Sequence, residues 1–211
     1  VNAHVQKLNF NNNTVDSVSF FTGDKLNHIK VNKEAILSAG AIGSPHLLQI
    51  SGIGDGEKIK KHGIEVVHEL KGVGKNLQDH LMFRPVYKLK NIKSLNRDVE
   101  NLYSKFLMGL QYIFKQSGPI TMGASQVCAF TKSDPSRATP NLQFHVQPLS
   151  TDILGVTPMH DFEGITPTVA NIRPSSRGEI NIASNDSRDN PKIKMNYLST
   201  QDDRDVAAKA L

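Results

Sequence analysis

The sequence predicts a mixed α/β protein built of two parts, and three features predict it. Up to about residue 80, short apolar strands alternate with glycine turns and short helices. Residues 98–118, DVENLYSKFLMGLQYIFKQSG, repeat apolar side chains at spacings of three and four, which is typical of an amphipathic helix. After this helix, NLQFHVQPL (141–149) and GEINIAS (178–184) alternate apolar and polar residues, as half-buried strands do.

Composition places the chain among ordinary globular proteins and argues against several classes of function. The 211 residues are 38% hydrophobic and carry a formal net charge of +5. The basic residues are scattered and Trp is absent, so we expect no nucleic-acid partner. The one cysteine, Cys128, has no second cysteine to pair with inside the chain. Neither paired Cys-x-x-Cys motifs nor His-Glu-x-x-His occur, so we expect no metal site.

An uncharged stretch, AILSAGAIGSPHLLQISGIG (residues 35–54), is long enough to cross a membrane. Glycines, a proline and polar side chains divide it into separate elements, so we expect no membrane span. The expected elements are a strand over 30–37, a turn over 40–43 and a helix over 46–50. Ser44 is the predicted N-cap, Pro45 the first helical residue and Gly52 the left-handed end of the helix.

The order strand, small-residue turn and helix start has two interpretations. Such a turn lets backbone N–H groups approach a phosphate or a nucleotide. The glycines could equally serve packing alone, and their spacing does not decide between the two. Because no G-x-G-x-x-G occurs in the chain, any dinucleotide contact here is secondary to one located elsewhere.

Several blocks resemble the glucose–methanol–choline (GMC) oxidoreductases, flavoenzymes that oxidise alcohols and sugars. GAIGSPHLLQISGIG (40–54) is similar to the second signature of that family. GVGKNLQDHL (72–81), RPSSRGEINIAS (173–184) and NPKIKMNYLS (190–199) resemble later family blocks. GPITMGASQVCAF (118–130) looks most like the insect glucose dehydrogenase branch. The resemblance implies that the chain is an internal portion of a considerably longer protein.

The resemblance also implies a fold and a cofactor. We expect part of an α/β FAD-binding domain over residues 1–80 and an α+β substrate-binding domain with an antiparallel sheet over 81–172. Residues 173–211 are expected to hold strands of the substrate-binding domain and the start of the C-terminal region of the family. The implied cofactor is FAD.

Four residues are expected at the FAD site because of this resemblance. The segment around Val5 resembles a family strand whose valine contacts the adenine end of FAD through its backbone. Ser38, Ala39 and Gly40 are expected beside the adenosine half, where a larger side chain would occupy the space of the ligand. From the residues alone, Val5 would be assigned as an ordinary core residue.

No catalytic residue is assigned within the chain. In the family, the glycine fingerprint precedes the part that this chain resembles, and the catalytic histidine and its partner follow it. Asn76, Asp79 and His80 are interpreted as hydrogen-bonding residues that fix a loop, with contact to the flavin as the alternative. His145 faces either the substrate cavity or solvent, and the sequence does not decide which.

The function implied by the resemblance is oxidation of the CH–OH group of an alcohol or sugar. Hydride passes to the flavin N5, and the electrons then pass to a quinone or to oxygen. A truncated, non-catalytic product without FAD is the alternative. A serine hydrolase is a third hypothesis, but GASQV (123–127) fails G-x-S-x-G at its last position. The sequence does not determine the compartment, and only the insect-type resemblance points to secretion.

Overall fold

The computed structural model describes residues 2–123, 125–153 and 155–211, which form two compact units. The first unit holds the described residues up to Asp79 together with Ser176–Ser199. The second unit holds His80–Ser175 and Thr200–Leu211. Ser176–Ser199 were expected in the substrate-binding domain. They lie in the first unit because a strand in this segment is hydrogen-bonded to a helix of that unit.

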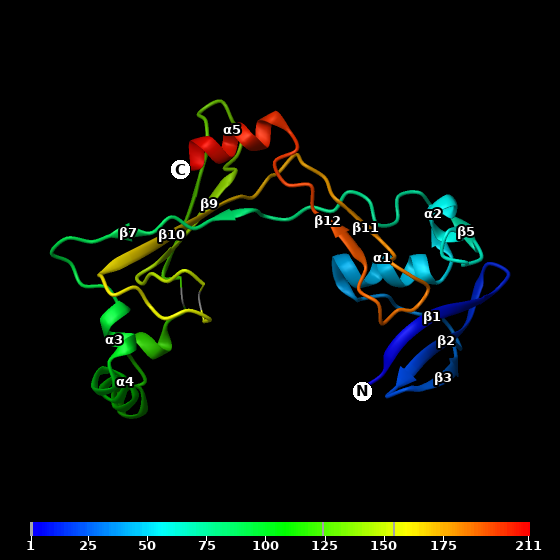
Figure 1. Ribbon diagram of the computed structural model, residues 1–211, viewed down its shortest axis with the longest axis horizontal. Coiled ribbons are helices and arrows are strands. Elements are labelled where there is room, and N and C mark those ends of the chain that lie inside the picture. Colours follow the sequence, from blue (N-terminus) through cyan, green and yellow to red (C-terminus); the bar gives the residue numbers. More distant parts are fainter. Residues whose placement is uncertain (1, 124, 154) are drawn as a thin grey trace. The chain divides into compact units, whose positions relative to one another are not determined.

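The first unit combines a small antiparallel sheet with short helices (Figure 1). Its elements are β1 (His4–Asn11), β2 (Thr14–Thr22), β3 (Lys25–Lys30), α1 (Gly40–Ile50), β4 (Ile53–Gly54), α2 (Gly56–Lys60), β5 (His68–Glu69), β11 (Glu179–Asn181) and β12 (Lys192–Lys194). Strands β1, β2 and β3 form the sheet in that order, β4 pairs with β5 in parallel, and β11 pairs with β12 antiparallel. Helix α1 packs against both β1 and β11.

The strand predicted over residues 30–37 is wrong. Strand β3 ends at Lys30. The Val31 N–H still donates to the Asp16 carbonyl oxygen of β2 at 2.8 Å, but no described strand is paired with residues 32–37. Ala35 and Leu37 are half-buried, whereas Ile36 between them is 79% exposed. The alternation therefore matches the burial of residues 35–37, but alternating burial becomes a strand only where a neighbouring strand shares a hydrogen-bond ladder.

Helix α1 begins at Gly40, so the predicted turn and N-cap are also wrong. The Ser44 hydroxyl accepts a hydrogen bond from the Ala39 N–H at 3.1 Å instead of capping a helix that starts after it. Pro45 lies inside the helix. The predicted end is confirmed, because Gly52 has φ +86° directly after α1 and a Cβ there would come within 2.4 Å of the Glu65 carbonyl oxygen.

The second unit contains the antiparallel sheet expected from the alternating segments. Its elements are β6 (Met82–Phe83), β7 (Tyr87–Lys88), α3 (Asn96–Glu100), α4 (Leu102–Lys115), the 3₁₀ helix η1 (Pro119–Thr121), β8 (Val127–Thr131), β9 (Leu142–Gln147), β10 (Gly164–Asn171) and α5 (Gln201–Ala210). The strand order is β6-β10-β9-β8, and β7 also pairs with β10. All of these pairings are antiparallel.

The two faces of this sheet differ in polarity. On one face, Leu142 and Val169 are buried against Val206 of α5, with Phe83 and Phe144 beside them. Side chains alternate between faces along a strand, so their neighbours lie on the opposite face. That polar face carries Gln143, His145, Gln147, Thr166 and Thr168. Helix α5 therefore covers only the apolar face.

The single helix predicted over residues 98–118 is two helices. Helix α3 ends before Asn101, whose backbone is extended at φ −83° and ψ 123°. The Asn101 side chain accepts hydrogen bonds from the N–H groups of Tyr103 and Ser104 at 2.9 and 3.1 Å. Asn101 is therefore the N-cap of α4, a role in which asparagine is strongly favoured.

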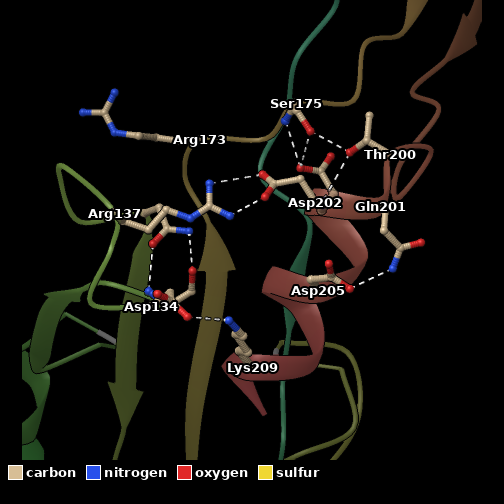
Figure 2. A network of polar contacts seen from close by, with 12 residues as sticks. Asp134, Arg137, Arg173, Ser175, Thr200, Gln201, Asp202, Asp205 and Lys209 are labelled. Carbon is tan, nitrogen blue, oxygen red and sulfur yellow. Dashed lines mark hydrogen bonds and ion pairs between the residues drawn. The ribbon is translucent and has the colours of Figure 1, made fainter.

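Polar contacts hold α5 to the second unit at both of its ends (Figure 2). The Arg137 guanidinium pairs with Asp202 in the first turn, and the Lys209 ammonium lies 2.7 Å from an Asp134 carboxylate oxygen near the last turn. Helix α5 itself therefore carries Asp202 and Asp203 in its first turn and Lys209 in its last turn, an arrangement of charges that the helix dipole favours. Hydrogen bonds from Lys209 and Ser136 lower the pKa of Asp134.

The buried carboxylate at this junction is Asp203, which is only 3% exposed. It accepts hydrogen bonds from the Ser175 N–H at 2.8 Å, the Ser175 hydroxyl at 3.1 Å and the Asn171 amide at 3.3 Å. Replacing Asp203 by alanine would remove a buried carboxylate and three hydrogen bonds to it, and would leave the Ser175 N–H and the Asn171 amide without this acceptor.

We therefore expect Asp203→Ala to lower the free energy of unfolding by about 3 kcal/mol. The measurement is urea denaturation. Asp205→Ala is the matched control, because Asp205 is exposed on the same helix and accepts a bond from Gln201. This variant should change stability by less than about 0.5 kcal/mol. Equal losses in the two variants would contradict the assignment.

Candidate functional site

The residues expected at the FAD site lie at two places on the first unit. Val5 is on β1 and is 36% exposed, so it is not a core residue. Ser38, Ala39 and Gly40 lead into the start of α1, and all three are exposed. Because β1 packs against α1, both places belong to one packed pair of elements.

The start of α1 carries no charge and no side-chain cap. The helix contains no Asp, Glu, Lys or Arg, and no described side chain caps its N-terminus. Burial and, secondarily, the neighbouring His4 lower the pKa of His46, so its imidazole is neutral at pH 7. The first N–H groups of a helix have no intrahelical acceptor, so those of α1 can donate to a ligand.

The position of α1 is fixed by the buried amide of Gln49. Its Nε2 donates to the Ile180 carbonyl oxygen at 2.9 Å, and its Oε1 accepts from the Ile182 N–H at 3.0 Å. The Ile180 N–H in turn donates to the Gly74 carbonyl oxygen at 2.7 Å. Three hydrogen bonds therefore join helix α1, strand β11 and the loop at Gly74.

A groove of about 380 Å³ lies beside the first turns of α1. Its lining is Ala41, Pro45, Gly74, Lys75, Asn76, Leu77, Gln78 and Ile180. Leu77 donates to the Gly178 carbonyl oxygen at 3.1 Å, and Gly178 donates back to Leu77 at 2.8 Å. This pair of bonds holds the loop of residues 74–78 next to β11. We call this cavity the α1 groove.

One carboxylate and two lysines hold the outer side of this loop. Glu179 on β11 pairs with Lys75 of the loop and, at 3.2 Å, with Lys58 of α2. Hydrogen bonds from these lysines lower the pKa of Glu179 to about 2. Glu179 is therefore a carboxylate at neutral pH, and its charge is compensated by the two ammonium groups.

The α1 groove and the segment before it fit the adenosine part of a dinucleotide. Gly40 has φ +75°, which favours glycine, and a Cβ there would meet no atom within 4 Å. Free N–H donors and small neutral side chains are what a close approach of a nucleotide to a backbone needs. The chain has no G-x-G-x-x-G loop.

The structure places two of the other candidate residues. Asp79 accepts a hydrogen bond from the Tyr197 hydroxyl, as the interpretation of Asp79 as a loop-fixing residue requires. This bond raises the pKa of Tyr197. His145 is half-buried on β9, where it pairs with Cys128 of β8 and Thr168 of β10 on the polar face of the sheet.

The serine hydrolase hypothesis gains no support from the described residues. Residue 124 of the GASQV segment lies outside the described residues. The Ser125 hydroxyl lies 3.4 Å from the Gln147 amide nitrogen, which cannot act as a general base.

Two further properties concern metals and membranes. In the described part of the chain, no group of three or more His, Cys, Asp or Glu side chains is placed to hold a metal ion. None of the helices formed by the described residues has the length and apolar character needed to cross a membrane.

Several known proteins are similar to this chain in sequence. The model of the GMC oxidoreductase family matches residues 1–82. The oxygen-dependent choline dehydrogenase of Photobacterium profundum is 37% identical over 94% of this chain and 35% of its own length. The alcohol dehydrogenase (acceptor) of Pseudomonas putida is 36% identical over 95% of this chain and 37% of its own length. Over residues 1–82, this chain therefore matches the GMC oxidoreductase family.

Solved structures agree in fold with this chain. A formate oxidase is 22% identical with a TM-score of 0.86, covering 99% of this chain and 41% of that one. A pyridoxine 4-oxidase from Mesorbium loti is 22% identical with a TM-score of 0.77, covering 99% and 37%. FAD is the cofactor of the family. The chain spans 35% to 37% of the length of the two dehydrogenases, neither of which is a glucose dehydrogenase.

The glycine pair in GVGKN supplies a matched test of the α1 groove. Gly74 has φ +78°, and a Cβ there would lie 2.2 Å from the Ile180 carbonyl oxygen and 2.4 Å from Gln49 Nε2. A Cβ at Gly72 would meet nothing within 4 Å. We expect Gly74→Ala to lower the free energy of unfolding by about 3 kcal/mol, from backbone strain and overpacking together.

Gly72→Ala is the control and should stay within about 0.5 kcal/mol of the wild type. Chemical denaturation measures both variants. A Gly74→Ala protein as stable as Gly72→Ala would show that the loop does not lie against Ile180.

The low pKa of Glu179 predicts a pH dependence with a defined sign. A carboxylate whose pKa is lowered by folding, here from about 4.3 to about 2, stabilises the protein above the unfolded value. That contribution disappears as the pH falls towards 2. We expect Glu179→Gln to cost about 1 kcal/mol at pH 6, after allowance for solvent screening, and almost nothing at pH 2.

The measurement is the difference in unfolding free energy between wild type and variant across this pH range. Glu57→Gln, at an exposed position of α2 in the same unit, should show a much smaller pH dependence. A Glu179→Gln difference that grows towards low pH would have the wrong sign for this ion pair.

Proposed function

We propose that this chain forms part of an FAD-dependent oxidoreductase that oxidises the CH–OH group of an alcohol or sugar. FAD, when bound, supplies the hydride acceptor. The similarity to GMC oxidoreductases supports the reaction class. The observation that carries the proposal for this chain is the exposed, uncharged segment of residues 38–40 at the uncapped start of α1.

In this proposal, the first unit binds the adenosine side of FAD. Ser38, Ala39 and Gly40 leave room for the nucleotide, and the first N–H groups of α1 are donors to its polar atoms. The backbone of Val5 contacts the adenine. Gln49 has an indirect role, because it fixes the position of α1.

The second unit has the role of the substrate-binding domain in this proposal. The substrate is placed beside the polar face of its sheet, which carries the half-buried His145 and the buried Gln147 and Thr168. Thr168 is 4% exposed, and its hydroxyl has no hydrogen-bond partner among the described residues. A catalytic base is not assigned to this chain, so these residues bind and orient the substrate.

The substrate and the electron acceptor are proposed as classes. Two relatives are named as choline and alcohol dehydrogenases, and one of these names includes oxygen dependence. These names support an alcohol substrate, with oxygen or a quinone as the acceptor. The glucose dehydrogenase branch, and with it secretion, rests on the resemblance of residues 118–130 alone.

A substitution at Ser38 tests the proposed contact with FAD. In protein expressed from the complete gene, Ser38→Trp should lower the ratio of bound flavin to protein on the order of tenfold. The indole would occupy the space of the nucleotide, and because Ser38 is exposed the fold should tolerate it. Flavin absorbance after gel filtration gives the ratio.

Asn32→Trp is the control, since Asn32 is exposed in the same connecting segment and outside the proposed site. It should keep the flavin content of the wild type. Full flavin content in Ser38→Trp would remove residues 38–40 from the site. A wild-type protein without flavin would favour the non-catalytic alternative.

A further inference from the structure

A guanidinium group lies on the polar face of the sheet in the second unit. Arg84 directly follows β6, whose Phe83 pairs with Val169 and packs on the apolar face. Because side chains alternate between faces, Arg84 falls on the polar face beside Thr168. A hydrogen bond agrees with this placement, since Arg84 Nη2 donates to Gln147 Oε1 at 3.3 Å. The face beside which the proposed function places the substrate therefore carries a positive charge.

The strands of this sheet supply no carboxylate to balance that charge. Strands β6, β7, β8, β9 and β10 contain no Asp or Glu. The carboxylates that flank β8 and β10 are engaged elsewhere, because Asp134 pairs with Lys209 and Glu163 accepts hydrogen bonds from Ser94. Among the described residues, none forms an ion pair with the half-buried Arg84.

The polar face also lacks a group of aromatic rings that would favour a quaternary ammonium ion. Phe130 is the one phenyl ring among its strand residues, and it pairs with Gln143 on the neighbouring strand. The other strand residues named on this face carry hydroxyl, amide or imidazole groups. These groups are suited to hydrogen bonds with an uncharged polar molecule.

We propose that Arg84 makes the substrate site selective for uncharged alcohols and against alcohols that carry a quaternary ammonium group. The inference rests on the proposed function, which places the substrate beside this face. With neighbouring strands about 4.8 Å apart, the backbones of Arg84 and His145 are roughly 10 Å apart across the Thr168 strand. Two cations repel at such a separation, and the half-buried position of Arg84 limits screening by salt. A specific site often contains such a repulsive element.

Flavin reduction by two alcohols of the same shape tests this inference in protein expressed from its complete gene. Choline, which is part of the name of one relative, is the cation. Neohexanol, in which carbon replaces the ammonium nitrogen, is its uncharged isostere. We expect kcat/KM to be higher for neohexanol on the order of tenfold, mainly through KM, because the repulsion acts on binding. Raising the ionic strength should narrow the difference, which a purely structural role of Arg84 would not predict.

Three variants separate charge from structure. Arg84→Gln should reduce the discrimination between the two alcohols to less than about threefold, and Arg84→Lys, which keeps the charge, should retain it. Arg173→Gln is the matched control, because Arg173 is exposed beyond the end of β10 and also donates to a neutral oxygen, the Pro140 carbonyl, at 3.3 Å. It should leave the ratio of the wild type unchanged. Because both alcohols are compared within one variant, the ratio does not depend on how much protein folds.

A preference for choline, equal use of the two alcohols, or a ratio that Arg84→Gln leaves unchanged would overturn the inference. Loss of discrimination in Arg84→Lys would overturn it as well, since the charge would then not be the cause. Flavin reduction by neither alcohol would also contradict it, while reduction by a different alcohol would leave the proposed function standing. A bound flavin that no alcohol or sugar reduces would refute the proposed function itself.

Discussion

The arrangement of the first unit depends on the buried amide of Gln49. Its two hydrogen bonds to Ile180 and Ile182 attach α1 to β11, a strand far away in the sequence. The same strand holds the loop at Gly74 by a backbone bond, so the Gln49 amide links α1 to both β11 and the loop that lines the α1 groove. A buried amide has few substitutes, because any replacement leaves two backbone groups without partners.

This attachment explains why one uncharged stretch has two different ends. At the C-terminal end of α1, Gln49 and Ile50 are buried. Ile50 needs an apolar environment, and the Gln49 amide needs partners for its hydrogen bonds. The N-terminal part is exposed and equally free of charge, which packing does not require. In the proposed function, this lack of charge allows a nucleotide to approach the backbone closely.

The sequence predicted local features better than the contacts between distant segments. The alternation in residues 141–149 predicted strand β9, and Gly52 predicted the end of α1. The same reasoning failed for residues 30–37, because alternation indicates an extended backbone but not a strand partner. It also missed the break at Asn101, although an asparagine before a helical pattern is a cap signal. No local pattern links Gly74 or Gln49 to Ile180, and these contacts build the groove.

The central claim is that residues 38–40 and the start of α1 lie against the adenosine half of FAD. Amide hydrogen exchange, followed by mass spectrometry in flavin-loaded and flavin-free protein, tests it most directly. The account predicts that the amides of residues 38–43 exchange more slowly when FAD is bound, while those of β3 do not change. Unchanged exchange at residues 38–43, with protection elsewhere in the protein, would contradict it.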